Sequence, residues 1–136
     1  MGTVYAEITL KNATDVADAE RGIIDKDKVR ETTVRAMVDT GAGSLVMDED
    51  VFLKLGLSVK GLRGVTLAGG ERMVARVTNP VEIHWKNRST TFPALVLPGK
   101  HEALLGAIPL EDMDLIVCPK KQELVGAHGD EILMMI

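Results

Sequence analysis

The stretch "AMVDTGAGSLV", residues 36–46, places an acid where a buried strand is expected to end. Three apolar residues run directly into Asp39, and small residues follow it. An ionised carboxylate without a partner is costly to bury, so an acid at this position needs a reason. Thr40 supplies a hydroxyl beside it, and Gly41 allows a backbone N–H to approach the carboxylate closely. The stretch therefore fits either a working carboxylate or an ordinary turn, since Asp-x-Gly stretches are common turn formers.

The composition around this stretch is that of a soluble globular domain. The chain has 136 residues, of which 46% are hydrophobic and 26% charged, and we expect one domain spanning residues 1–136. Only 3% are aromatic, so the core must be built from Val, Leu, Ile, Ala and Met. The net charge of -4, without a basic patch, argues against binding of nucleic acid. The single cysteine, Cys118, excludes an internal disulfide and suits a reducing compartment.

The sequence carries no targeting or membrane signal. Its start, "MGTVYAEITL", has neither a basic region nor a long apolar run, so no signal peptide is expected. No stretch approaches the roughly 18 consecutive apolar residues that a membrane span needs. A cytoplasmic location, without membrane contact, is the default expectation.

Short strands dominate the rest of the chain. Residues 3–10 alternate apolar and polar positions, which predicts a strand, and residues 32–38 form the strand that delivers Asp39. A helix over residues 48–56 is expected to begin at Asp48 and end at Gly56. Residues 11–31 are polar and are expected to form a solvated excursion or a long hairpin. The remaining expected elements are a hairpin over 64–77, a hairpin over 79–98, a strand, short helix and strand over 102–117, and an apolar strand over 131–136. This pattern favours a closed or sandwiched β fold.

Three landmarks in order resemble the retropepsin-like aspartic proteases, specifically the single-domain bacterial and retroposon-like members. "MVDTGAGSLV" resembles their active-site strand and loop, the 64–77 hairpin lies at the place of their flap, and "ALLG" before a short helix resembles their second hydrophobic-hydrophobic-Gly motif. The landmarks cover roughly residues 33–117. The resemblance implies the following site residues: Asp39 as the catalytic acid, Thr40, Gly41 and Ala42 as its support, Ala68, Gly69 and Gly70 in the flap, and Leu104, Leu105 and Gly106 in the second motif.

The resemblance also implies a fold and an activity. The fold would be mainly β, a closed, barrel-like subunit with a flap hairpin and one or two short helices, functional as a C2 homodimer. The activity would be that of an aspartic endopeptidase, a hydrolase in which a water is activated between two Asp39 carboxylates, one from each subunit. The partners would be a second copy of the chain and a peptide or protein substrate, with no cofactor. A non-catalytic dimerisation or peptide-binding module of the same fold is the alternative.

Two departures from the retroviral pattern affect the expected dimer. Retroviral members often carry an acid after the Ala of the first motif and an Arg after the Gly of the second, and here those positions are Gly43 and Ala107. Both charged residues of that salt bridge are absent, so neither charge is left without its partner. Residues 131–136 are the candidate dimer interface instead, because the terminal strands of the two subunits interleave in retropepsin-like dimers. The alternative is that this strand completes the core of its own subunit.

Other chemistries find little support in the sequence. The three histidines, His84, His101 and His128, form no i, i+4 pair of a zinc protease, and no metal site is expected. Ser44 does not lie in a Gly-x-Ser-x-Gly motif, and Cys118 has no assigned base.

Overall fold

The computed structural model describes residues 2–134 and 136. In chain order the elements are β1 (Tyr5–Asn12), α1 (Ala13–Glu20), the 3-10 turn η1 (Lys26–Lys28), β2 (Glu31–Val38), β3 (Leu45–Met47), α2 (Glu49–Leu55), β4 (Val59–Thr66), β5 (Arg72–Thr78), β6 (Val81–Trp85), β7 (Arg88–Phe92), β8 (Ala94–Val96), β9 (Ala103–Leu105), α3 (Ala107–Asp112), β10 (Leu115–Cys118) and β11 (Glu123–Gly126). The expectation of a mainly β fold is confirmed.

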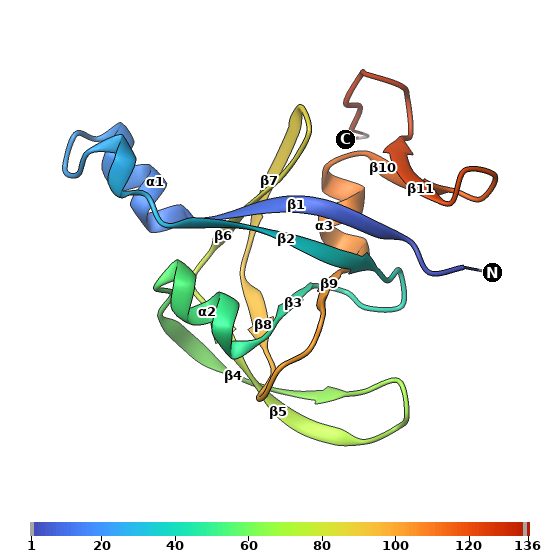
Figure 1. Cartoon of the computed structure of the whole chain (residues 1–136), viewed down its shortest axis with the longest axis horizontal. Helices are drawn as coiled ribbons and strands as arrows, with labels where there is room; N and C mark the ends of the chain where they lie inside the picture. The colour runs from blue at the N-terminus through green and yellow to red at the C-terminus, as the bar shows by residue number, and fades with distance from the viewer. Residues whose placement is uncertain (1, 135) are drawn as a thin grey trace.

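Nine strands of the described residues form one sheet in the order β4-β5-β8-β3-β9-β2-β1-β6-β7, and β10 and β11 form a separate pair. Strands β1 and β2 run side by side across the molecule, while the β4–β5 hairpin projects from its lower edge in Figure 1. The β10–β11 pair lies at the opposite edge, beside the C-terminal segment. The sheet curls around a core whose largest fully buried side chains include Ile8, Leu10, Leu45, Met47, Ile83 and Leu105.

The expected helix and the 64–77 hairpin are confirmed, and the hairpin expected over 79–98 is confirmed only as far as Phe92, because Ala94–Val96 form β8, which pairs with β3 and β5. Strands β4 and β5 pair antiparallel, as do β6 and β7, which turn at Lys86 and Asn87. Helix α2 begins after Asp48, whose carboxylate accepts a hydrogen bond from the Val51 N–H at 3.1 Å. It ends at Gly56, which has φ of 60°, a left-handed conformation that glycine adopts without the Cβ clash of other residues. Local cap and turn chemistry therefore specifies these elements.

The long-hairpin alternative for residues 11–31 is wrong, because this segment contains helix α1 and the turn η1. Asn12 caps α1 by accepting the Asp15 N–H at 3.0 Å, and the buried Asp15 carboxylate binds the Arg30 guanidinium through contacts of 2.8 and 2.9 Å. The Arg30 guanidinium holds the pKa of Asp15 below its usual value. Asp15 and Arg30 are fifteen residues apart, and their contact connects helix α1 to the residue just before strand β2.

The expected strand over residues 131–136 is also wrong for the part that the structure describes. Glu131 makes an isolated bridge to His128, and residues 132–134 and 136 are irregular; residue 135 lies outside the described residues. The Arg88 guanidinium donates to the Glu131 carbonyl at 3.4 Å, and it also donates to the carbonyls of Met113 and Asp114 at 2.8 and 2.7 Å and to that of Gly129. The Leu133 N–H donates to the Asp114 carboxylate at 3.1 Å. Contacts between side chains and the backbone, not a strand ladder, order the described part of this segment.

Candidate functional site

Three strands of the main sheet position the loop that begins at Asp39. Strand β9 lies between β2 and β3, parallel to β2 and antiparallel to β3. Val38 at the end of β2 pairs with Leu105 at the end of β9, and the Asp39 N–H donates to the Leu105 carbonyl at 3.0 Å. Asp39 therefore follows a strand near the centre of the sheet, and the neighbouring strand β9 fixes the position of its backbone.

The two glycine-bearing segments cross where β9 ends. The Ala107 N–H donates to the Ala42 carbonyl at 2.8 Å, and the Ile108 N–H donates to the Gly43 carbonyl at 3.0 Å. A Cβ on Gly106 would lie 2.5 Å from the Ser44 carbonyl oxygen and 2.7 Å from that of Ala42. Only glycine fits this crossing, because the atoms in the way belong to the backbone.

The Asp39 carboxylate is half-buried, and the loop holds it in place. The Gly41 N–H donates to Oδ1 at 2.9 Å, and a Cβ on Gly41 would sit only 3.2 Å from the same oxygen. This bond fixes the direction in which the carboxylate points. The Thr40 side chain is exposed and has no hydrogen-bond partner within the described part of the chain.

A cavity of about 550 Å³ runs from Asp39 to the β4–β5 hairpin. Its walls are largely apolar, and Asp39 is its only acidic lining residue within the described part of the chain. On the hairpin side, the turn is closed by hydrogen bonds from the Leu67 N–H to the Glu71 carbonyl and from the Gly70 N–H to the Leu67 carbonyl, each 2.8 Å. The lining residues are Asp39, Gly41, Ala42, Gly43, Ser44, Val46, Val65, Thr66, Leu67, Ala68, Leu95, Leu97 and Leu104.

The structure brings together some of the predicted site residues and separates others. Asp39, Gly41, Ala42, Ala68 and Leu104 line this cavity. Leu105 and Gly106 are buried behind it, Gly69 and Gly70 are exposed at the hairpin tip, and Thr40 lines a second cavity of about 490 Å³ between the loop and β10. Gly70 has φ of 86°, whereas Gly69 adopts no positive φ.

Sequence reasoning missed the apolar walls contributed by the ends of β4 and β8 and by the residues that directly follow these strands. Val65 and Leu67 are two residues apart, as are Leu95 and Leu97, so each pair shares one face of an extended segment. That spacing was the available signal, but it does not distinguish a cavity wall from core. No group of three or more His, Cys, Asp or Glu side chains in the described ranges is arranged to hold a metal ion. No helix in those ranges has the length and apolarity to span a membrane.

The model of the aspartyl protease family matches residues 26–108, more than half of the chain. The chain belongs to the aspartyl protease family. The matched range contains the Asp39 loop, the β4–β5 hairpin and the Gly106 crossing, which are the three landmarks of the retropepsin-like pattern.

One solved structure supports the fold of this chain. The retroviral protease-like domain of Ddi1 from Leishmania major is similar to this chain with a TM-score of 0.56 and 16% identity, over 92% of this chain and 88% of that one. The EIAV protease in complex with the inhibitor HBY-793 is 26% identical over 60% of this chain and 77% of that one, with a TM-score of 0.49. None of the curated proteins matches this chain. The expected retropepsin-like fold of this aspartyl protease family member is confirmed.

Proposed function

We propose that this aspartyl protease family member is an active endopeptidase that hydrolyses extended peptides. The observation that carries the proposal is the Asp39 carboxylate, half-buried at one wall of a 550 Å³ apolar cavity with Oδ1 held by the Gly41 N–H. Partial desolvation of a carboxylate costs free energy, and catalysis, unlike simple peptide binding, gives a reason to keep an acid in that position.

The chemistry needs two carboxylates, and each chain supplies one. One carboxylate takes a proton from the attacking water as general base, and the other, protonated, polarises the scissile carbonyl. Two such groups about 3 Å apart share a proton, because both cannot be ionised together. Since Asp39 is the only acid lining the cavity within the described residues, the second carboxylate would be Asp39 of a second copy related by C2 symmetry.

The β10–β11 pair replaces residues 131–136 as our candidate for the dimer interface. In the described part of the chain, β10 and β11 pair with no third strand, so the β10 edge is open, and Ile116 on β10 is 51% exposed. Val117 and Pro119 line the 490 Å³ cavity that also contains Thr40 and Asp39, so this pair approaches the back of the catalytic loop. A second copy that added a strand at the β10 edge would cover Ile116, leave the β11 edge free and bring the two Asp39 loops together.

The cavity walls indicate which substrates would fit. An extended peptide would place alternate side chains against Val46, Val65 and Leu104, which favour apolar residues beside the scissile bond. The β4–β5 hairpin would act as a lid, since Ala68 reaches the cavity while Gly70 provides a turn that can move. We therefore expect apolar residues on both sides of the cleaved bond.

The test compares Asp39→Asn and Asp39→Ala with the unaltered protein on a fluorogenic peptide library rich in apolar residues, from acidic to neutral pH. Both variants should lose hydrolysis while they sediment and melt like the parent. Asp50→Asn is the matched control, because Asp50 is an exposed acid whose nearest cation, Lys100, is 3.9 Å away. Hydrolysis that persisted in either Asp39 variant would remove Asp39 from the mechanism. A parent protein that folds, dimerises and binds peptides without cleaving any would favour the non-catalytic module.

A further inference from the structure

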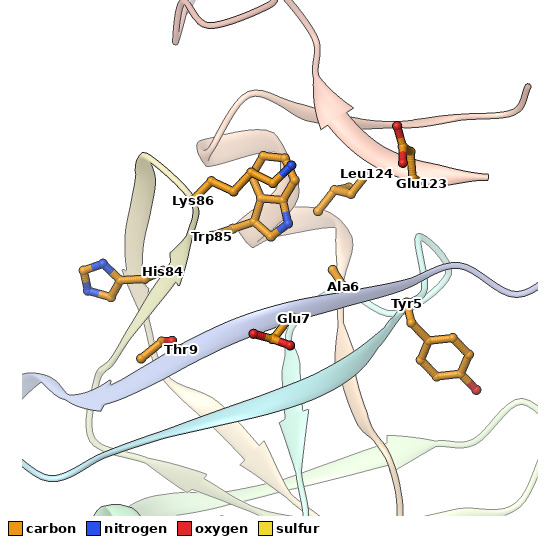
Figure 2. Close-up of a pocket in the computed structure, with 9 residues that line it drawn as sticks. All are labelled: Tyr5, Ala6, Glu7, Thr9, His84, Trp85, Lys86, Glu123 and Leu124. Atoms are coloured by element: carbon orange, nitrogen blue, oxygen red, sulfur yellow. The ribbon is translucent and has the colours of Figure 1, made fainter. Parts of the chain in front are cut away.

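Half of strand β1 has a neighbour on one side only. Strand β2 pairs with β1 along Tyr5 to Lys11, but β6 pairs with it only from Thr9 to Asn12. Strand β6 ends at Trp85, where the chain turns away toward β7. Beyond that point the β1 edge faces a gap bounded by the β6–β7 turn and by β11, as Figure 2 shows.

The hydrogen-bonding direction along β1 alternates, and the structure fixes which residues face the gap. The Val38 N–H donates to the Val4 carbonyl at 2.8 Å, and the Asn12 N–H donates to the Arg30 carbonyl at 3.0 Å, so even-numbered residues bond toward β2. Odd-numbered residues therefore bond toward β6. The main-chain N–H and C=O groups of Tyr5 and Glu7 point into the gap, and none has a hydrogen-bond partner among residues 2–134 and 136.

A cavity of about 420 Å³ lies along this open edge, and it shares no lining residue with the cavity at Asp39. Its inner side is apolar, formed by the buried Ala6, Trp85 and Leu124, and Trp85 is only 8% exposed. The three side chains converge from β1, β6 and β11 in Figure 2. An extended segment beside β1 would place alternate side chains against this apolar floor.

The outer side of the cavity carries excess negative charge. Glu7 and Glu123 are exposed and take part in no ion pair within the described ranges. The lining cation, Lys86, has its amine 4.6 Å from the centroid of the Trp85 ring, where a cation–π contact holds it. Arg35 lies opposite Glu7 on β2, but its guanidinium stacks on the Tyr5 ring at 3.8 Å from the ring centroid. A basic side chain on a ligand would therefore find two carboxylates that make no ion pair within the described ranges.

We propose that this edge binds an extended segment of another protein as an added β-strand, with apolar side chains directed at Trp85 and Leu124 alternating with basic side chains directed at Glu7 and Glu123. Main-chain pairing with Tyr5 and Glu7 supplies affinity, and the alternating side chains supply selectivity. Because this docking edge lies apart from the Asp39 cavity, a protein held there keeps the active site open. The proposal does not depend on hydrolytic activity.

The probe is a fluorescein-labelled, end-capped peptide that alternates Lys and Val, with its binding followed by fluorescence anisotropy. A peptide that alternates Glu and Val should bind at least about tenfold more weakly, because it sets like charges against Glu7 and Glu123. In a strand, alternate amides face the same edge. N-methylation of one alternating set of amides should therefore abolish binding, and N-methylation of the other set should leave the affinity nearly unchanged. Equal effects of the two methylated sets would overturn strand addition.

Amide hydrogen exchange locates the peptide on the unaltered protein. In the free protein the Tyr5 and Glu7 amides should exchange fast while those of Ala6 and Ile8, which bond to β2, exchange slowly. Saturation with the Lys–Val peptide should slow Tyr5 and Glu7 selectively. If the free protein protects these two amides more strongly as its concentration rises, a second copy of the chain occupies the edge. That result would overturn the proposal.

Two charge variants complete the test. Glu7→Lys should weaken binding of the Lys–Val peptide by about tenfold, and Glu20→Lys, the same change at an exposed site on α1, should not. Asp39→Asn should bind the peptide as the parent does. Equal weakening by the Glu7 and Glu20 variants would reduce the contact to non-specific charge attraction and refute the docking edge.

Discussion

Replacing Gly106 by alanine would place a methyl group inside the crossing that supports Asp39. The new Cβ would lie 2.5 Å from the Ser44 carbonyl oxygen, 2.7 Å from the Ala42 carbonyl oxygen and 2.7 Å from the Gly43 carbonyl carbon. All three atoms are backbone, so no side chain can rotate away. The φ of -90° at Gly106 suits alanine, so the penalty comes from crowding and not from backbone conformation.

The magnitude follows from two opposing terms. Overpacking a close-packed site costs about 1–3 kcal/mol or more, and replacing glycine lowers the entropy of the unfolded chain, which returns about 0.4–1 kcal/mol. We expect Gly106→Ala to lower the free energy of unfolding by about 1–2 kcal/mol, a fall in Tm of about 3–8 °C for a chain of this size. Activity should fall further than stability, because the displaced backbone carries the Asp39 loop.

The assay is urea unfolding followed by fluorescence of the single tryptophan, Trp85, which is buried. Gly69→Ala is the matched control, because a Cβ there meets nothing within 4 Å and Gly69 has no positive φ. The control should be as stable as the parent or slightly more stable. If Gly106→Ala unfolds at the same urea concentration as Gly69→Ala, the crossing is looser than described and the account of the Asp39 loop fails.

Three further predictions test other parts of the structure. Asp15→Asn should lower the free energy of unfolding by about 1–2 kcal/mol at neutral pH, because it breaks the pair with the half-exposed Arg30. Since the Arg30 guanidinium lowers the pKa of Asp15 in the folded state, this stabilisation is present above the ordinary carboxyl pKa and is lost as the pH falls through the lowered one. The difference between variant and parent in urea unfolding should therefore shrink in acid, and a constant difference would contradict the pairing. Replacing Gly69 and Gly70 together by Val should slow peptide turnover much more than it lowers Tm, because Gly70 needs its φ of 86° at the tip of the hairpin that we propose as a lid. An unchanged turnover rate would mean that the hairpin is no lid. Arg88→Met should lower the free energy of unfolding in urea by about 3 kcal/mol, because Arg88 is 3% exposed and its guanidinium donates to the carbonyls of Met113, Asp114 and Gly129. A loss no larger than that of a surface substitution would show that contacts other than those of Arg88 hold the C-terminal segment.

Local signals in the sequence predicted those parts of the fold that local chemistry specifies. Helix α2 was found from the Asp48 cap and Gly56, and both hairpins from alternation interrupted by turn residues. Helix α1 was missed because its sequence, "ATDVADAE", has no strong apolar stripe. Its anchor is the contact between Asp15 and Arg30, and a pairing of distant polar residues leaves no periodic pattern.

The error at residues 131–136 has the same physical origin. An apolar run predicts a strand only if a neighbouring strand offers backbone partners, and here the Glu131 carbonyl accepts from the Arg88 side chain while the Leu133 N–H donates to the Asp114 carboxylate. Ile132 and Leu133 remain about half exposed as a result. Nothing in the sequence around Arg88 indicated that its guanidinium would be buried against backbone carbonyls.

The candidate site was predicted in part. The resemblance named both Asp39 and Gly106 as site residues, and the structure brings their two segments into contact through the bonds of Ala107 and Ile108. The cavity walls at Val65 and Leu95 could not be recognised, because an apolar residue on a strand faces a core or a cavity depending on tertiary packing alone. The open edge of β1 likewise depends on where β6 turns away, which no local pattern records.

The central claim is that two Asp39 carboxylates, one from each of two chains, form one active site. The most direct measurement mixes the unaltered protein with Asp39→Asn, allows the subunits to exchange fully, and records hydrolysis per unaltered chain. If mixed dimers are inactive, an equal mixture should show about half the activity per unaltered chain, and the activity should fall further in proportion as the variant is added in excess. Activity per unaltered chain that stays constant at every ratio, while sedimentation shows that mixed dimers have formed, would contradict the shared site.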